Sequence, residues 1–423
     1  MEKVSRWKNE QMGKLNSAIR NLILAWRNLW RNPGRTGALI AAIAVGLWAG
    51  VMTVGLVNGM YEQRIDYVIR SDLGHLQVHH PEYLSEREME LGILGQQTVL
   101  AYLKQADGVE GVSERTYADG MFRSARSSSG VRIHGIVPES EVEVTSLGEM
   151  VTEGSMPDAA ARNPLLLGEV LAEEHGIDLG HRVVLTFEDL SGDILSASFT
   201  VTGLYESRSK DMDKMHLYVL SEDLRRLLGR EDLTHEIVVR LEDPAMTASF
   251  VETMQAQFPD HSVQSWDQLS PEIKMMIDYG GVSLVLITVI IMLALSFGIL
   301  NTMLMSLFER KREIGMLISI GMSRARVFWM MMAESMALTL VGSVFGMGLA
   351  FLAISYYAQN GLSLAAFAEG LAKIGWDSLV FPFVTVDDFV TISVIVIGMT
   401  LLSSLYPALK AFRMNPLEAS KDL

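Results

Sequence analysis

Four blocks of apolar residues are long enough to cross a membrane. They cover residues 37–60, 281–308, 327–357 and 389–412, and charged residues are rare within them. A bilayer-spanning helix needs about 20 consecutive, mostly apolar residues. The pattern therefore predicts one span, a long intervening region, and three further spans that follow one another closely.

The region between the first two blocks changes to a pattern of short elements. Apolar and polar residues alternate over 72–80 and 131–137, as in half-buried strands. The stretches 182–188 and 194–205 flank Ser191-Gly192-Asp193, which predicts a hairpin. Helical spacing occurs at 98–105, 169–175, 222–228 and 245–257.

These elements predict an α+β domain of two lobes. We expect an inner lobe of about residues 61–119 and 231–280 and an outer lobe of about residues 120–230. Residues 265–277 lead directly into the second span, and only Gly280-Gly281 interrupts the pattern. A helix that continued through these glycines would transmit motion mechanically. A break there would make an ordinary join, and both interpretations stay open.

Charge predicts the orientation of the spans. Residues 1–36 carry eight Lys/Arg and two acids, and the 309–326 loop carries five and two. The 358–388 connection carries one Lys and four acids, and residues 61–280 carry 18 Lys/Arg and 39 Asp/Glu. Positive charge stays in the cytoplasm. Both termini, including the 413–423 tail, and the 309–326 loop are therefore expected inside, and the acidic domain outside.

The acidity of the external domain has two interpretations. The formal net charge of the chain is −15, and the domain accounts for all of its acidic excess. Such a surface is typical of a well-solvated domain, and it would also suit docking of a basic partner. Both interpretations stay open at this point.

Several kinds of chemistry are not expected. The chain has no cysteine, which excludes disulfides and thiolate sites. No phosphate-binding loop, zinc-protease motif or nucleophile elbow is present, so we predict no catalytic residue and no cofactor in this chain. His75, His79 and His80 lie close together on an alternating stretch. We expect them on a solvated face rather than around a metal ion.

An amphipathic helix is expected over residues 14–31, before the first span. Trp26 and Trp30 follow helical spacing, with Arg27 and Arg31 between them. Aromatic and basic residues on different faces suit a helix in the membrane interface. A plain cytoplasmic extension is the alternative.

Two kinds of residue stand out inside the spans. Gly46 and Gly50 lie one turn apart, as do Gly342 and Gly346, and such pairs let helix backbones approach closely. They could form a seam between two copies, or occur by chance in apolar stretches of this length. Glu334 is an acid within the third span, where charge is costly. It could carry protons, but without an intramembrane Lys, Arg or His to relay to, a structural hydrogen-bond acceptor is favoured.

The 309–323 stretch is the most informative short segment. It opens with alternating charge, becomes apolar, and ends at Gly321, with Ser323 placed to cap the next helix. A short helix with apolar and charged faces between two spans suits docking into a soluble partner. It could also lie on the lipid surface.

This stretch resembles the signature of permeases of the FtsX/MacB type. In that signature a Glu-Ile-Gly run closes on glycine and a small residue, here Glu313-Ile314-Gly315 to Gly321. The start 27–36, the closing motif 406–419, Asn301 and Glu334 also fall on family-typical positions. Residues 74–78 and 167–172 are similar to lipoprotein-release permeases of the LolC/LolE type, although the connection at 190–197 is short where one member has an extended hook.

The resemblance implies a non-catalytic permease subunit of an ABC transporter, with the type VII (MacB-like) one-plus-three architecture. It would lie in the bacterial inner membrane and pair with a second permease, the same or homologous. Two copies of a separate ATPase subunit would bind ATP and Mg. No nucleic acid partner is implied. The coupling helix that sits in the ATPase groove would use Glu309, Arg310, Lys311, Arg312, Glu313, Ile314, Gly315, Leu317 and Gly321.

Three functions stay open under this resemblance. The first is mechanical extraction or release of lipoproteins or membrane lipids, with a periplasmic carrier. The second is MacB-like export of a periplasmic substrate through an adaptor. The third is FtsX-like signalling to an envelope enzyme without transport.

Overall fold

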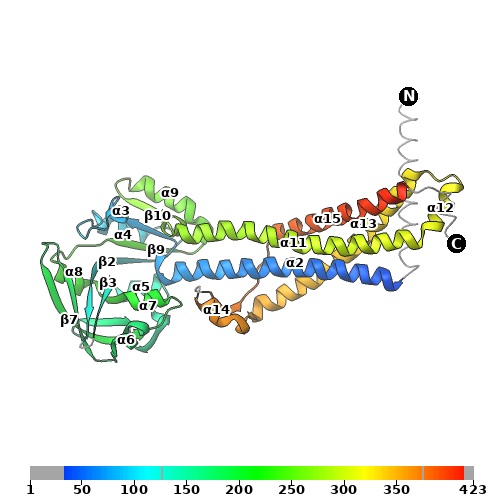
Figure 1. Ribbon diagram of the computed structural model, residues 1–423. Coiled ribbons are helices and arrows are strands. Elements are labelled where there is room, and N and C mark those ends of the chain that lie inside the picture. The colour runs from blue at the N-terminus through cyan, green and yellow to red at the C-terminus, as the bar shows by residue number, and fades with distance from the viewer. Residues whose placement is uncertain (1–32, 125–126, 374–375, 414–423) are drawn as a thin grey trace, which may run out of the picture. The chain divides into compact units, whose positions relative to one another are not determined.

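The computed structural model describes residues 33–124, 127–373 and 376–413 (Figure 1). The chain divides into two compact units. Of the described residues, we call 33–61, 278–366 and 378–413 the membrane unit, and those within 62–277 and 367–377 the external unit. The expected interfacial helix with Trp26, Arg27, Trp30 and Arg31 lies outside the described residues, as does the tail beyond residue 413.

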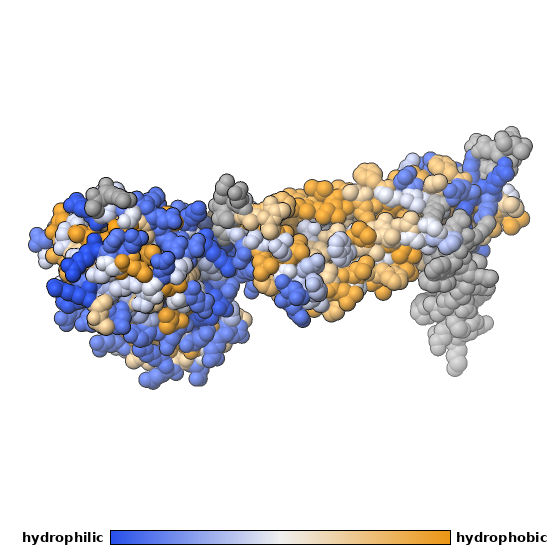
Figure 2. Space-filling model, turned by 90° about the horizontal axis from the view of Figure 1, so that it is seen from below, coloured by the Kyte–Doolittle hydropathy of each residue, from blue (hydrophilic) through white to orange (hydrophobic). Residues whose placement is uncertain are grey.

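Four long helices carry the apolar blocks. They are α2 (Pro33–Val68), α11 (Pro271–Glu309), α13 (Arg324–Asn360) and α15 (Val386–Phe412). Each is long and apolar enough to cross a membrane, so the prediction of four spans is confirmed. Figure 2 shows hydrophobic residues over much of the surface that these helices present. In water such a surface would be unstable, and in a bilayer it contacts lipid or other spans.

Helix α11 continues through both glycines that the sequence left ambiguous. The chain instead breaks at Ser270, between α10 (Trp266–Leu269) and Pro271, because proline favours the first turn of a helix. A side chain at Gly280 would collide with the ring of Tyr61 in α2. This glycine therefore permits close packing and does not end the helix.

The other glycine pairs pack helices of one chain together. A Cβ at Gly50 would lie 3.1 Å from Met292 in α11, and Gly46 faces Leu295 of the same helix. Gly342 and Gly346 of α13 face α2, where Ala44 Cα would lie 3.0 Å from a Cβ at Gly346. These four glycines thus form seams inside the membrane unit, as small residues do between membrane helices.

The external unit is built on a ten-stranded sheet (Figure 1). Its order is β10-β1-β9-β2-β3-β8-β5-β7-β4, and β6 pairs with β2 and β7. The long strand β2 pairs with β9 through Val109–Arg115 and then with β3 and β6. The strands are β1 (Leu76–His79), β2 (Val109–Arg123), β3 (Ser128–Ile136), β4 (Val151–Gly154), β5 (Pro164–Gly168), β6 (Arg182–Glu188), β7 (Ile194–Tyr205), β8 (His216–Leu220), β9 (Glu236–Leu241) and β10 (Ser262–Ser265).

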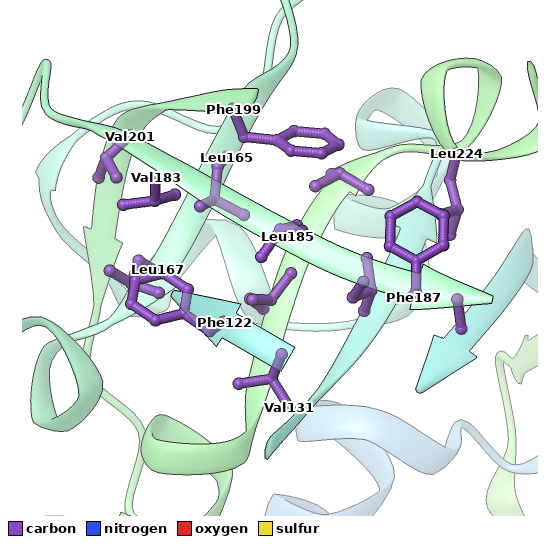
Figure 3. Close-up of a cluster of buried hydrophobic side chains, with 14 of the residues drawn as sticks. Phe122, Val131, Leu165, Leu167, Val183, Leu185, Phe187, Phe199, Val201 and Leu224 are labelled. Carbon is purple, nitrogen blue, oxygen red and sulfur yellow. The ribbon is translucent and has the colours of Figure 1, made fainter. Parts of the chain in front are cut away.

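Short helices cover this sheet. Three apolar clusters form beneath them: one around Leu76 and Ile237, one around Phe122 and Leu165, drawn in Figure 3, and a smaller one around Ile136 and Tyr205. Strand β2 contributes Val112 to the first cluster and Phe122 to the second. The helices are η1 (Ile69–Leu73), α3 (Tyr83–Glu86), α4 (Gln96–Leu103), α5 (Pro138–Val144), η2 (Leu147–Met150), α6 (Glu169–His175), α7 (Lys210–Met215), α8 (Ser221–Leu228), η3 (Pro244–Met246) and α9 (Thr247–Gln257).

The β6–β7 hairpin confirms the predicted turn. The register runs from Arg182 opposite Thr200 to Glu188 opposite Ile194, which leaves a turn of residues 189–193. Asp189 Oδ1 accepts hydrogen bonds from the backbone N–H groups of Ser191 and Asp193, at 2.8 and 3.0 Å. The connection is therefore shorter than the expected 190–197.

The prediction of a solvated histidine face is wrong. His75 and His79 are buried, because β1 is paired on both edges and covered on both faces. His75 Nδ1 accepts from the backbone N–H of Leu241 at 3.0 Å, and His79 Nε2 lies 3.0 Å from Gln77 Oε1. Among the described residues no group of three or more His, Cys, Asp or Glu could hold a metal ion.

The 358–388 connection contains short elements of its own. Strands β11 (Leu362–Ser363) and β12 (Leu379–Val380) pair, and η4 (Ala365–Phe367) and α14 (Ala368–Lys373) lie between them. The following span, α15, begins with a capping box, in which Thr385 and Asp388 hydrogen-bond each other's backbone N–H groups.

Candidate functional site

The loop between the second and third spans forms helix α12 (Lys311–Ser319). It ends as a Schellman motif: Met322 N–H donates to Leu317 O at 3.0 Å, and Gly321 N–H donates to Ile318 O at 3.1 Å. Gly321 has φ +102°, a conformation that suits glycine. Ser323 then caps α13 as expected, with its side chain accepting from Arg326 N–H. Local sequence alone thus ends one helix and starts the next.

Helix α12 has one face buried within the membrane unit. Ile314 is 3% exposed, and Gly315 beside it is also buried. Ile314 packs in an apolar cluster with residues from the ends of α11, α13 and α15, namely Leu307, Val327, Met331, Ala408 and Ala411. The inward face therefore fastens α12 to three spanning helices at once.

The opposite face of α12 is open. Met316 is 64% and Ile320 79% exposed, and Arg312 and Ser319 are exposed beside them. These four residues, which we call the docking face, follow one side of a helix. Met316 and Ile320 were missed by the sequence reasoning, although their spacing of four was visible. Large apolar side chains exposed beside a basic residue are typical of a surface that a protein partner covers.

The nine expected coupling residues differ in their burial. Ile314 and Gly315 point inward, whereas Glu309, Arg312 and Gly321 are exposed. The other four, Arg310, Lys311, Glu313 and Leu317, are half-buried. Asn301 is exposed on α11, apart from this cluster along the helix.

Glu334 of α13 has a basic partner. Arg310 Nη1 donates to both of its carboxylate oxygens, at 3.0 and 3.3 Å. Arg310 lies outside the expected spans and reaches Glu334 from the junction between α11 and α12. The favoured interpretation, a structural acceptor, agrees with this geometry.

A second arginine lies at the centre of the external unit. Arg115 of β2 is 1% exposed and binds three acids from three other elements. Its guanidinium lies 2.6 Å from Glu141 of α5, 2.9 Å from Glu236 of β9 and 2.9 Å from Asp72 of η1. It also donates to the backbone carbonyl of Asp72 at 2.8 Å. Because η1 directly continues α2, this cluster fastens the end of the first spanning helix to the sheet.

The three acids do not carry equal charge. Burial alone would raise the pKa of Glu141, but Arg115 and hydrogen bonds from Ser113 and Thr145 hold that pKa below its usual value. Burial prevails at Glu236 and raises its pKa to about 7, despite the opposing effect of Arg115. One guanidinium cannot balance three carboxylates, and this shortage of positive charge adds to the effect of burial on the pKa of Glu236.

Two family models match the chain. The MacB-like periplasmic core domain matches residues 36–257, just over half of the chain, and the FtsX-like permease C-terminal region matches residues 285–416. The chain belongs to the FtsX/MacB-type ABC transporter permeases. Its four spans and external α+β domain give it the type VII permease architecture.

Curated relatives of this permease cover most of its length. The lipoprotein-releasing system transmembrane protein LolC of Neisseria meningitidis is 22% identical over 90% of this chain and 92% of its own. The corresponding LolE of Haemophilus influenzae is 23% identical over the same shares. Among solved structures, the periplasmic region of MacB from Actinobacillus actinomycetemcomitans is 13% identical, with a TM-score of 0.35 over 48% of this chain and 93% of that chain.

The external unit of this permease also has a groove of about 430 Å³. It is lined by residues of α4, β2 and α5 and by Val137, with both apolar and acidic side chains among them. Two of its acids are already paired within the fold, because Glu110 binds Arg240 and Glu114 binds Arg225. Some acidic residues of the external unit therefore form ion pairs within the unit.

Proposed function

We propose that this permease couples ATP hydrolysis by a separate ATPase subunit to motion of its external unit. The observation that carries the proposal is the two-faced α12. Its inward face is packed against the ends of three spans, and its docking face leaves Met316 and Ile320 open to a partner. Force applied to such a helix is passed to the spans because the packed interface does not yield easily.

The long helices supply the route for that motion. Helix α11 runs unbroken over 39 residues, from Pro271 to the junction with α12. Helix α2 continues into η1, where Asp72 is bound by Arg115. Both helices therefore carry residues of the two units, which supports mechanotransmission along them rather than passage of a substrate between them.

The assembly we propose contains two ATPase subunits and a second permease, identical or homologous. ATP and Mg bind to the ATPase subunits, outside this chain. The charge asymmetry supports a place in the bacterial inner membrane with both termini and α12 in the cytoplasm. Membrane lipids then surround the apolar helix surface.

Release of lipoproteins or lipids from the inner membrane is the favoured substrate chemistry. It rests on relatives named as lipoprotein-releasing proteins that align over nine-tenths of the chain. The alternatives are export of a periplasmic substrate, as the name of the macrolide export protein MacB of Sodalis glossinidius suggests, and signalling to an envelope enzyme. The short 189–193 turn leaves little room for a carrier to grip at that position.

Purification of the full chain in detergent from its native host tests the assembly and its cargo. We expect an ATPase subunit and an acylated protein or lipid to copurify, detected by mass spectrometry. Depletion of the permease should retain lipoproteins in the inner membrane. Unchanged lipoprotein localisation, with no acylated species in the complex, would contradict the release function but not the ATPase partnership.

Charge reversal in the loop tests the coupling separately. The double variant Glu309→Lys/Glu313→Lys should uncouple ATP turnover of the complex from its ATP-driven activity, because both acids flank the start of α12. Asp387→Asn, at an exposed acid in the first turn of α15, is the control. Normal ATPase binding and coupled turnover in the double variant would contradict the role of this loop.

A further inference from the structure

The Arg310–Glu334 ion pair joins the start of α12 to α13, and neither residue belongs to the docking face. Glu334 is 13% and Arg310 22% exposed, so the pair is largely shielded from water. Its neighbours along α13, Met330, Met331 and Leu338, are buried and apolar. A carboxylate in such surroundings is costly to keep without a partner, and two contacts from one guanidinium nitrogen satisfy it.

The backbone of Arg310 belongs to both helices of the junction. Its N–H donates to Ser306 O of α11 at 3.1 Å, and its carbonyl accepts from Ile314 N–H of α12 at 3.0 Å. Its φ and ψ, −98° and 12°, depart from those of a continuous helix and turn the chain. Any change in the angle between α11 and α12 must therefore move the Arg310 side chain.

Arg310 contacts acids on both α12 and α13. Arg310 Nε lies 3.6 Å from Glu313 Oε2 in α12, while Nη1 holds Glu334 in α13. One side chain thus reaches an acid on each neighbouring helix. The apolar cluster around Ile314 also holds α12 against displacement, but apolar contacts are non-directional and do not by themselves fix the rotation of the helix. The ion pair is directional and would set the angle.

We propose that Arg310 is a positioning residue for coupling, whose ion pair with Glu334 fixes the angle of α12 against α13. Force on the docking face then reaches α13 directly as well as through α11. This inference rests on the proposed function of α12 and deepens it, because it adds a second route into the membrane unit. Without the pair, α12 can rotate against the apolar cluster around Ile314, and part of the motion that the ATPase imposes on α12 does not reach α13.

The chain has no cysteine, so spin labels can be attached without background. We would label Ser319→Cys on α12 and Val344→Cys on α13, both exposed, in the full chain in lipid nanodiscs. Pulsed electron spin resonance should give one narrow distance distribution. Glu334→Gln keeps the shape but removes the charge and should broaden the distribution at least twofold, whereas the control Asp387→Asn should not. A wild-type width in Glu334→Gln would overturn the inference.

Two further variants separate positioning from simple loss of structure. Arg310→Lys keeps the charge but loses the two-oxygen contact, so it should give an intermediate width. The charge swap Arg310→Glu/Glu334→Arg should recover a narrow distribution if the pair itself sets the angle. A swap as broad as Glu334→Gln would overturn the inference.

The functional arm uses the complex with the ATPase subunit. Glu334→Gln should leave ATPase affinity within a few fold of wild type. It should lower ATP turnover of the complex by roughly tenfold to hundredfold, the effect of losing one charge-assisted hydrogen bond. Wild-type turnover in an intact variant complex would overturn only this inference. A wild-type chain that bound no ATPase would instead overturn the proposed function.

Discussion

Arg115 in the external unit and Arg310 in the membrane unit are held in different ways. Arg115 is 1% exposed and contacts three acids, while Arg310 is 22% exposed and makes close contact with one. Arg115 lies where η1, the continuation of α2, meets the sheet. Arg310 lies where α11 and α12 meet α13. Arg115 has more acidic partners than its charge can balance, whereas Arg310 has one acid in hydrogen-bond contact, Glu334, and a second, Glu313, at 3.6 Å.

The difference points to different tasks. A fully buried arginine that binds several acids cannot move without leaving those charges unpaired, so it holds the elements around it in fixed positions. A partly exposed pair yields to force at lower cost because water reaches it. We therefore interpret Arg115 as a rigid anchor of η1, and the Arg310–Glu334 pair as a contact that sets the angle of α12 and still yields when force acts on the helix.

The largest effect is expected at Arg115. Arg115→Met retains the bulk but leaves Glu141, Glu236 and Asp72 without their shared partner, which should cost about 3–5 kcal/mol of stability. Thermal unfolding of the detergent-solubilised chain, followed by circular dichroism, would measure it. An unchanged melting temperature would mean that Arg115 does not anchor the external unit.

A second effect concerns the excess acid in the Arg115 cluster. The pKa of Glu236 is raised to about 7 in the fold, so its proton favours the folded state. That contribution is full below the ordinary pKa near 4.5 and is lost as pH rises through about 7. Glu236→Gln is always neutral, so its stability relative to wild type should rise by about 1–3 kcal/mol from pH 4.5 to 8. Parallel stability–pH curves for the two proteins would contradict this.

The docking face should affect binding and leave folding unchanged. Ile320→Asp places a charge on an apolar contact, and we expect ATPase affinity to fall roughly tenfold to hundredfold. The melting temperature should stay the same, because Ile320 is 79% exposed. Val386→Asp, at an equally exposed residue that starts α15, is the matched control. Equal affinity of the two variants would exclude this face as the ATPase contact.

The smallest effect is expected at a surface ion pair. Arg132 binds Asp119 at 2.9 Å through two nitrogen donors, but both side chains are partly exposed. Arg132→Gln should therefore cost no more than about 1 kcal/mol. A loss as large as that of Arg115→Met would show that burial does not distinguish the two arginines.

Much of the fold could be predicted from local patterns. The spans, the β6–β7 hairpin and the α12–α13 turn each depend on residues close in sequence, such as Gly192 or Gly321 with Ser323. Apolar length, turn residues and caps act over a few positions, so a single sequence displays them. His79 in β1 and His75 just before it were misplaced, because their burial depends on strands β9 and β10, which are far away in the chain.

In the candidate site, too, some features depend on local sequence and others on tertiary packing. Sequence alone indicated that the 309–323 stretch is a short two-faced helix between spans, and it favoured a structural role for Glu334 over proton transfer. It did not show which face of α12 points outward, because that depends on how α11, α13 and α15 converge around Ile314.

Only the tertiary structure decided the two arginine clusters. Arg115 meets acids 26, 43 and 121 positions away, and Arg310 meets one 24 positions away. Nothing in the local pattern distinguishes these arginines from those on the surface. A buried charge must be paired, but the folded chain determines which acid is near enough to pair with it.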